Sequence, residues 1–183
     1  MKTTLIMSHP YFEDSRVNRA LFEAAKGVPD VSVRHLEAIY GSDTRAFDVK
    51  AEQDLLIGAD RIVFQFPMFW FSVPPMLKAY MDEVLRGKFI NDNGNSKLDG
   101  KELQIAISIG AQESEYSKKG SVKFTLGEIL LPLQLGAYYC GMTFNRIFAA
   151  GGALGATEAD IKAHVQRYVK LLRNELEEDE YQI

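Results

Sequence analysis

The segment RIVFQFPMFWFSVPPMLKAYMDEVL, residues 61–85, carries the pattern that decides the fold. Its first six residues form a short, mostly apolar run that is typical of a buried strand, and Pro67 ends that run. Pro74 and Pro75 then open a helix, because proline is tolerated in the first helical turn. We therefore expect a strand at 61–66, an aromatic loop, and a helix from 74 to about 85.

The same alternation of strand-like and helix-like stretches runs along the whole chain. The pattern predicts further strands at 3–7, 31–36, 102–108 and 143–148, and further helices at 15–26, 50–59, 124–137 (bent or interrupted by Pro132) and 157–178. Strands separated by helices form βαβ units, and such units build a parallel sheet. The sequence therefore predicts an α/β fold: a flavodoxin-like, doubly wound sheet of five parallel strands with helices on both faces.

Composition excludes several classes of protein. The chain has 183 residues, 46% hydrophobic and 25% charged residues, and a formal net charge of −4. This is the balance of one soluble globular domain, which we place at 1–176, followed by an acidic tail at 177–183. The charge does not favour nucleic-acid binding, and no apolar run is long enough to span a membrane. The lone Cys140 and the absence of a signal peptide favour a cytoplasmic protein.

The first candidate loop follows strand 3–7 and leads into the next helix. His9 lies in this loop, and Ser15, Arg16, Val17 and Asn18 stand where the helix begins. Free backbone N–H groups and the helix dipole make such an end an anion site, to which Ser15 could add a hydroxyl and His9 a donor. The alternative is a plain capped helix with Ser15 as its N-cap. No glycine-rich dinucleotide motif and no Walker motif is present.

The second candidate loop is unusually aromatic for a surface connection. It contains Pro67, Met68, Phe69, Trp70 and Phe71. A flat, conjugated ligand could lie against such a wall, with backbone N–H groups at its polar edge. The alternative is that these side chains fill a core or a contact between subunits.

The third candidate loop follows strand 102–108 and contains Ser108, Ile109, Gly110, Ala111 and, further along, Tyr116. Gly110 permits a close approach of the backbone to a ligand, and Tyr116 could donate a hydrogen bond. The alternative is an ordinary solvated loop. No metal site is expected, because the three histidines are far apart in the sequence.

Taken together, the three loops resemble those of the NAD(P)H:quinone oxidoreductase family of flavodoxin-like flavoproteins. The resemblance extends to about residue 172 and is greatest with the short bacterial branch, which includes the ancillary protein of the glutathione-gated potassium-efflux system. It rests above all on QFPMFWFSVPP at 65–75, and also on HP at 9–10, AEQ at 51–53, LDGK at 98–101, PLQ at 132–134 and YCGM at 139–142.

The resemblance implies a flavin in the crevice between the loops. Carried over residue by residue, His9 and the stretch 15–18 would hold its phosphate, 67–71 would line the ring system, and 108–111 would meet the pyrimidine edge. Tyr116 would be the catalytic residue beside the site. The short chain favours FMN, with FAD as the alternative, and NADH or NADPH would be the electron donor.

Two departures from the family pattern concern the third loop. The family commonly has Thr-Thr-Gly-Gly after this strand, whereas this chain has Ser108-Ile109-Gly110-Ala111. Larger animal relatives pair the tyrosine with a histidine a few residues later, and no histidine follows Tyr116 nearby. A Tyr–His proton relay is therefore not expected in this chain.

Three functions follow as hypotheses. The first is a homodimeric enzyme that passes two electrons, as hydride, from NAD(P)H through the flavin to a quinone or similar acceptor, in ping-pong order within one pocket. The second is a regulatory partner of a membrane potassium-efflux antiporter, which would place the protein at the inner membrane through that partner. The third is a flavodoxin-type electron carrier, against which the modest charge of −4 and the aromatic loop both argue.

Overall fold

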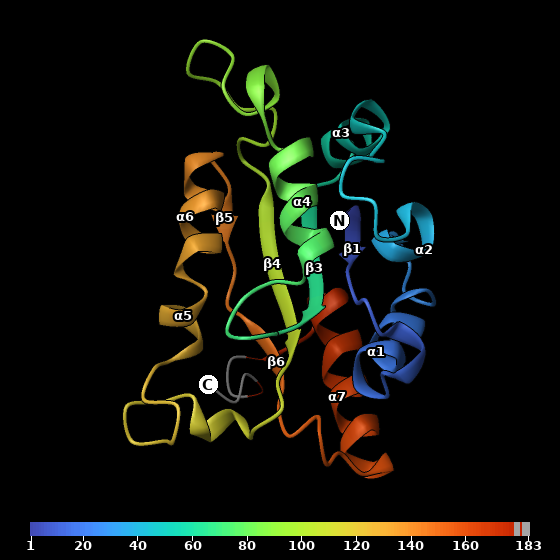
Figure 1. Cartoon of the computed structure of the whole chain (residues 1–183), viewed down its shortest axis with the longest axis vertical. Coiled ribbons are helices and arrows are strands. Elements are labelled where there is room, and N and C mark those ends of the chain that lie inside the picture. The colour runs from blue at the N-terminus through green and yellow to red at the C-terminus, as the bar shows by residue number, and fades with distance from the viewer. Residues whose placement is uncertain (178–179, 181–183) are drawn as a thin grey trace.

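The computed structural model describes residues 1–177 and 180. Its sheet has the order β2-β1-β3-β4-β5, and every pairing is parallel. Figure 1 shows β1, β3 and β4 side by side at the centre of the molecule. The strands are β1 (Thr3–Met7), β2 (Val31–His35), β3 (Arg61–Pro67), β4 (Glu102–Ser108), β5 (Thr143–Phe144) and β6 (Phe148–Ala150). The expected doubly wound, flavodoxin-like fold is confirmed.

Helices cover both faces of the sheet. The α-helices are α1 (Val17–Ala25), α2 (Leu36–Tyr40), α3 (Val49–Ile57), α4 (Pro75–Val84), α5 (Leu126–Ile129), α6 (Leu131–Tyr139) and α7 (Glu158–Leu172). Short 3-10 turns lie at Phe12–Asp14, Gly87–Phe89 and Glu113–Glu115. Along β1, Leu5 and Met7 pack in the core under α1 and α7, whereas Ile6 packs in the other core, under α3, α4 and α6. This alternation is the two-residue period of a strand.

The fifth strand position is divided, where the sequence pattern predicts one strand at 143–148. β5 pairs with the start of β4 and β6 with its end. Between them, the buried Gln104 side chain donates from Nε2 to the Arg146 carbonyl at 2.8 Å. A side-chain amide therefore replaces a ladder bond in the interruption.

The helix expected at 124–137 is two short helices, because the chain turns at Leu130 and Pro132 stands in the first turn of α6. α2 was not predicted: it is only five residues long, and it starts directly at the end of β2.

The last helix ends earlier than its periodic pattern predicts. Asn174 has φ 60°, its N–H donates to the Leu171 carbonyl, and the next N–H, of Glu175, donates to the Lys170 carbonyl. This is a Schellman ending with asparagine in the left-handed position. Most of the acidic tail at 177–183 lies outside the described residues, although Lys170 donates to the Glu180 carboxylate at 2.5 Å.

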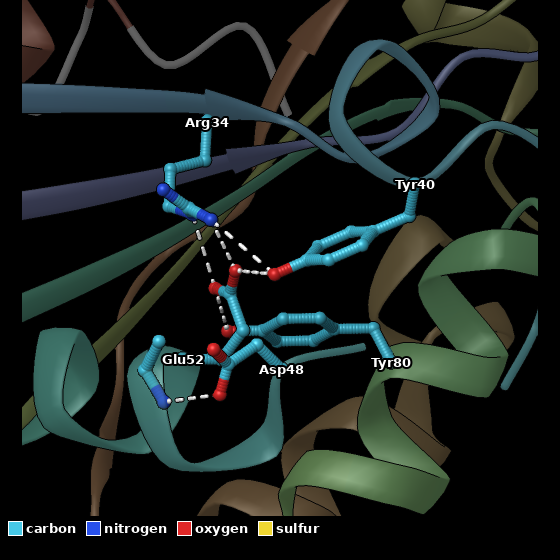
Figure 2. Close-up of polar contacts among 6 residues, drawn as sticks. Arg34, Tyr40, Asp48, Glu52 and Tyr80 are labelled. Carbon is cyan, nitrogen blue, oxygen red and sulfur yellow. Dashed lines mark hydrogen bonds and ion pairs between the residues drawn. The ribbon is translucent and has the colours of Figure 1, made fainter. Parts of the chain in front are cut away.

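A buried carboxylate connects β2 with three helices (Figure 2). Glu52 of α3 is fully buried and pairs with Arg34 of β2. It also accepts from the hydroxyls of Tyr40 (2.6 Å) and Tyr80 (3.3 Å), which lie on α2 and α4. Burial, followed by the Glu52 charge, raises the pKa of Tyr80 well above its usual value. We call Arg34, Tyr40, Glu52 and Tyr80 the Glu52 cluster.

Candidate functional site

The three candidate loops meet at the carboxyl edge of the sheet, where the strand order reverses between β1 and β3. The rings of His9 and Phe69 bring the first and second loops together, with centroids 6.0 Å apart. Asn18 at the start of α1 donates to the Ser108 hydroxyl at 2.5 Å, which ties the first loop to the third. This edge is the usual ligand position of a doubly wound sheet.

The start of α1 offers backbone donors to a ligand. Ser15 is not the N-cap that a capped helix requires, because Arg16 takes that position and no side chain caps the helix. Within the described residues, the N–H groups of Arg16, Val17 and Asn18 have no hydrogen-bond acceptor. The Val17 and Asn18 side chains are buried, so only their N–H groups are available. Such a helix start attracts an anion.

The Arg16 guanidinium contacts the segment at the start of α7. It donates to the Ala156 carbonyl at 2.7 Å and pairs with Glu158 at the start of α7. This residue therefore joins the N-terminal ends of α1 and α7 through its side chain. Its contribution to an anion site is its backbone N–H.

The His9 ring is fixed by the loop around it. Its Nδ1 accepts from the Tyr11 N–H at 3.1 Å, so the proton of the neutral ring belongs on Nε2. Burial lowers the pKa of His9 below its usual 6.5, although the nearby Glu37 carboxylate opposes the shift. His9 is therefore a neutral donor through Nε2 at neutral pH.

Glu37 of α2 fixes this loop through two hydrogen bonds. Its carboxylate accepts from the Ser8 hydroxyl at 2.7 Å and from the His9 N–H at 3.0 Å. Burial raises the pKa of Glu37, but hydrogen bonds from His35, Ser8 and His9 outweigh burial and leave the pKa lowered. The sequence analysis missed Glu37, because no pattern marked α2.

The second loop contains an unusual turn. The N–H and carbonyl groups of Phe69 and Ser72 bond to each other at 3.1 and 3.0 Å, and the two residues between them have positive φ, 46° for Trp70 and 61° for Phe71. Positive φ at both central positions defines a type I′ turn, which normally takes Asn and Gly. Bulky residues in this conformation store strain, and such strain concentrates at functional sites.

This turn presents its aromatic rings to solvent. Trp70 is 93% exposed and Phe71 is 51% exposed, while Pro67 is buried at the end of β3 and Met68 and Phe69 are half-buried. The alternative that this loop fills the core of the chain is therefore wrong for Trp70 and Phe71. The open wall fits a planar ligand.

The third loop divides into a supporting part and an open part. Ile109 is buried and its N–H donates to the Ala150 carbonyl at 3.1 Å, so it cannot contact a ligand through that group. In the described part of the chain, the N–H groups of Gly110 and Ala111 have no acceptor. A Cβ on Gly110 would come within 2.9 Å of Cδ1 of the exposed Leu154 side chain, which could rotate away. Within the described stretch 109–111, the N–H groups of Gly110 and Ala111 are thus left as donors for a ligand.

Tyr116 follows the 3-10 turn after this loop. It is buried and belongs to the same apolar cluster as Ile109, against which Met68 and Ala111 also pack. Burial raises the pKa of Tyr116, so its hydroxyl is a neutral donor at neutral pH.

A buried polar chain lies beneath the loops and was missed by the sequence analysis. Gln65 of β3 donates from Nε2 to the Asn18 carbonyl at 2.9 Å, and the Tyr168 hydroxyl of α7 donates to Gln65 Oε1 at 3.0 Å. With the bond from Asn18 to Ser108, this chain connects α1, β3, β4 and α7 under the site. A glutamine inside the apolar run RIVFQF was the available signal.

Two other kinds of site were sought in the described residues. No group of three or more His, Cys, Asp or Glu side chains there could hold a metal ion. None of the helices within the described part of the chain is long and apolar enough to cross a membrane. Cys140 is buried, and burial raises the pKa of its thiol.

Comparison with known proteins identifies the family. The family model described as a flavodoxin-like fold matches residues 1–172. The chain belongs to this family. Among curated relatives, the uncharacterized NAD(P)H oxidoreductase YrkL of Bacillus subtilis is 41% identical, covering 96% of this chain and 99% of that protein. The glutathione-regulated potassium-efflux system ancillary protein KefF of Klebsiella aerogenes is 34% identical, covering 90% of each chain.

Similar solved structures agree with the fold. General stress protein 14 of Treponema denticola, in complex with FMN, matches with a TM-score of 0.85 and 30% identity, over 95% of this chain and 99% of that one. An NADPH-quinone reductase of P. pentosaceus matches at 0.82 and 28%, over 93% and 97%. A protein described as a thermophilic tryptophan halogenase of Streptomycin violaceusniger matches at 0.88 and 34%, over 92% and 97%. Homologues of the chain thus include NAD(P)H oxidoreductases and quinone reductases.

Proposed function

We propose that this protein is an FMN-dependent NAD(P)H oxidoreductase that reduces a quinone or a similar acceptor. The observation that carries the proposal is the strained turn that holds Trp70 and Phe71 open to solvent next to His9. The relative with a bound FMN and the relatives described as oxidoreductases support it.

The proposed binding mode uses backbone donors at both ends of the flavin. The phosphate would meet His9 Nε2, the Ser15 hydroxyl, and the N–H groups of Arg16, Val17 and Asn18. The ring system would lie against the wall formed by Pro67, Met68, Phe69, Trp70 and Phe71. Its pyrimidine edge would meet the Gly110 and Ala111 N–H groups, while Ser108 and Ile109 support that loop from behind. No glycine-rich dinucleotide motif adds a place for a longer cofactor, which favours FMN over FAD.

The residues of the chain would orient the flavin, stabilise charge and donate hydrogen bonds. A bound FMN supplies the ring that accepts and returns the hydride. The N–H groups of Gly110 and Ala111 are positioned to stabilise negative charge at the pyrimidine edge, because donors fixed in place cost no reorganisation during the reaction. Tyr116 is the proposed catalytic residue, as a neutral hydroxyl donor beside the crevice. Since one open face serves both substrates, NADH or NADPH and the acceptor would bind in turn, with ping-pong kinetics.

We further propose that the enzyme is a homodimer. The exposed face of α6 carries four large apolar or aromatic side chains at helical spacing, Leu131, Leu135, Tyr138 and Tyr139. An apolar cavity of about 210 Å³, whose lining includes Met81, Leu85 and Cys140, adjoins this helix. Figure 1 shows α6 at an outer edge of the molecule. We call this face the α6 patch, and a second copy of the chain is its proposed occupant.

A regulatory role remains the second candidate because of the KefF relatives. Under this alternative the protein would bind a potassium-efflux antiporter and lie at the inner membrane only through that partner; otherwise it would act in the cytoplasm. Co-purification with such an antiporter, together with a transport rate that depends on this protein, would favour it. Full NAD(P)H-dependent activity of the purified protein without any transporter favours the enzyme. An electron carrier would instead be reduced in two separate one-electron steps in a potentiometric titration.

The Trp70→Ala variant tests the proposed site. Loss of the ring should lower the FMN content of the purified protein or its rate of NAD(P)H oxidation. The Ile57→Ala variant, which changes an exposed side chain on α3, is the control and should retain both. An unchanged FMN content and rate in Trp70→Ala would remove the second loop from the site.

A further inference from the structure

The buried polar chain beneath the three loops leads from the core of the molecule to the proposed site. Its members, in order, are Tyr168, Gln65, Asn18 and Ser108. The first three are fully buried, whereas Ser108, at the end of β4, retains 7% exposure. The chain therefore ends at the carboxyl edge of the sheet, where a ligand of a doubly wound fold binds.

The main-chain carbonyl of Asn18 fixes the direction of these hydrogen bonds. One atom of the Gln65 amide lies 2.9 Å from this carbonyl, which can only accept, so that atom is Nε2 and the other is the acceptor Oε1. The Tyr168 hydroxyl, 3.0 Å from Oε1, must then donate. Burial raises the pKa of Tyr168, so the hydroxyl keeps the proton that it donates.

The same reasoning orients the Asn18 side chain. Gln65 Nε2 is a donor and lies 3.3 Å from one atom of the Asn18 amide, so that atom is the acceptor Oδ1. Asn18 Nδ2 therefore faces Ser108 and donates to its Oγ at 2.5 Å. An amide nitrogen offers no lone pair, so Ser108 Oγ is the acceptor in this bond and its own proton is directed elsewhere.

The Ser108 hydroxyl is the open end of the chain. Within residues 1–177 and 180, its proton has no acceptor, although polar groups in such nearly closed positions normally have partners. Ser108 is bonded to Asn18, at the proposed phosphate end of the flavin, and precedes Gly110 and Ala111, at the proposed ring end. The part of FMN between these ends is the ribityl chain, whose hydroxyl oxygens are acceptors.

We propose that Ser108 donates a hydrogen bond to the ribityl chain of FMN, and that Gln65 is the positioning residue that keeps this proton free for the cofactor. Without Gln65 Nε2, the Asn18 amide could turn over and accept the Ser108 proton itself. Tyr168 holds Gln65 in its place. This inference rests on the proposed FMN site, and it gives Ser108 a bond to the cofactor in addition to its support of the third loop.

Two flavins separate the ribityl chain from the phosphate. FMN and riboflavin share the ribityl chain and the ring system, but only FMN has a phosphate. The dissociation constant of each from the full chain is measured by the quenching of flavin fluorescence. Ser108→Ala should weaken both by the same factor, roughly tenfold, whereas Ser108→Thr keeps the hydroxyl and should retain both affinities. A loss for FMN alone, or no loss for either flavin, would overturn the bond to the ribityl chain.

The positioning role of Gln65 is tested in the same titrations. Gln65→Leu should weaken both flavins as much as Ser108→Ala does, and combining the two substitutions should cause no further loss. A structural role alone would disturb the start of α1, where the phosphate is held. The loss would then be larger for FMN than for riboflavin and would persist beside Ser108→Ala, and either result would contradict the positioning role.

Controls cover folding and the chemistry of the substitution. Gln53→Leu removes a similar bond, from Nε2 to the Val84 carbonyl at 2.8 Å, and should retain both affinities. Thermal unfolding shows whether each variant is folded. If Gln65→Leu is unfolded, Gln65→Leu/Tyr168→Phe takes its place with the same expected losses, because it replaces both bonded partners by apolar groups of similar shape.

The two proposals fail in different ways. An unchanged chain that binds neither flavin would contradict the FMN site, and the inference about Ser108 would fall with it. An unchanged chain that binds both flavins, with a folded Ser108→Ala variant that binds them equally well, would leave the FMN site in place and contradict only the Ser108 bond.

Discussion

At the scale of single residues, the strain at Trp70 and Phe71 links stability to function. A planar ligand needs exposed rings, and the type I′ turn provides them by placing two bulky residues at positive φ. Each such residue costs of the order of 1–3 kcal/mol, which the rest of the fold has to offset. The sequence of this loop is therefore poor for stability, as expected of an element of the proposed site.

The strain predicts a difference between two substitutions of one residue. Trp70→Gly and Trp70→Ala both lose the ring, but only glycine is relaxed at φ 46°. Trp70→Gly should therefore be more stable than Trp70→Ala by about 1 kcal/mol in urea unfolding, and neither should regain FMN affinity. Ser72 lacks positive φ, so the Ser72→Gly variant should be less stable than the Ser72→Ala variant. Equal stabilities at Trp70 would show that the turn is relaxed.

Glu37 predicts a pH dependence of stability. Its pKa is lowered in the fold, so the unfolded chain binds its proton more readily, and stability from Glu37 is present above the unfolded pKa of about 4.3. It is lost as the pH falls through the folded pKa. Glu37→Gln should be less stable than the unchanged chain by about 1–3 kcal/mol at pH 7, with a smaller deficit at pH 3. Urea unfolding at both values measures this. A deficit that is constant with pH would contradict a carboxylate holding the His9 loop.

At the scale of helices and strands, the sequence predicted the elements whose bounds depend on a local pattern of residues. Thr3–Met7 and Glu102–Ser108 were predicted with the bounds that the structure has, because short segments rich in apolar and β-branched residues are typical of buried strands. The division between β5 and β6 depends on the side chain of Gln104 reaching another strand. The end of α7 depends on one left-handed asparagine. Neither feature has a periodic signal.

The Glu52 cluster predicts coupled stability between β2 and the helices. Arg34→Met leaves the buried Glu52 carboxylate with tyrosine hydroxyls alone and should cost about 3–5 kcal/mol. The double variant Arg34→Met/Glu52→Leu removes both charges and should recover most of that loss. Urea unfolding of the single and double variants measures the coupling. Additive losses would mean that the pair is not coupled.

At the scale of the whole molecule, the sequence predicted which loops meet at one edge of the sheet better than it predicted the contacts that their residues make. The topology places three strand ends at one edge, so the loops could be predicted from strand order alone. The role of a residue depends on which partners its polar groups contact, and the sequence pattern does not give these partners. Arg16 pairs with Glu158, the Asn18 side chain donates to Ser108, and the Ile109 N–H donates to the Ala150 carbonyl. Glu37 and Tyr168 support the site from distant elements, which no spacing in the sequence reveals.

The α6 patch predicts the oligomeric state. Leu135→Glu places a charge at the centre of an exposed apolar face and should shift the protein from dimer to monomer in analytical ultracentrifugation. Ile57→Glu, which changes an exposed apolar residue outside the α6 patch, on α3, should leave the dimer intact. A chain that is monomeric without any substitution would refute the proposed homodimer.

The central claim is that the three loops hold a redox-active flavin. The most direct measurement is the visible absorption spectrum of the purified protein, followed by anaerobic addition of NADPH and, separately, NADH. The account predicts a flavin spectrum that bleaches with at least one nucleotide, and the faster nucleotide identifies the donor. A colourless protein that binds neither added FMN nor added FAD would contradict it.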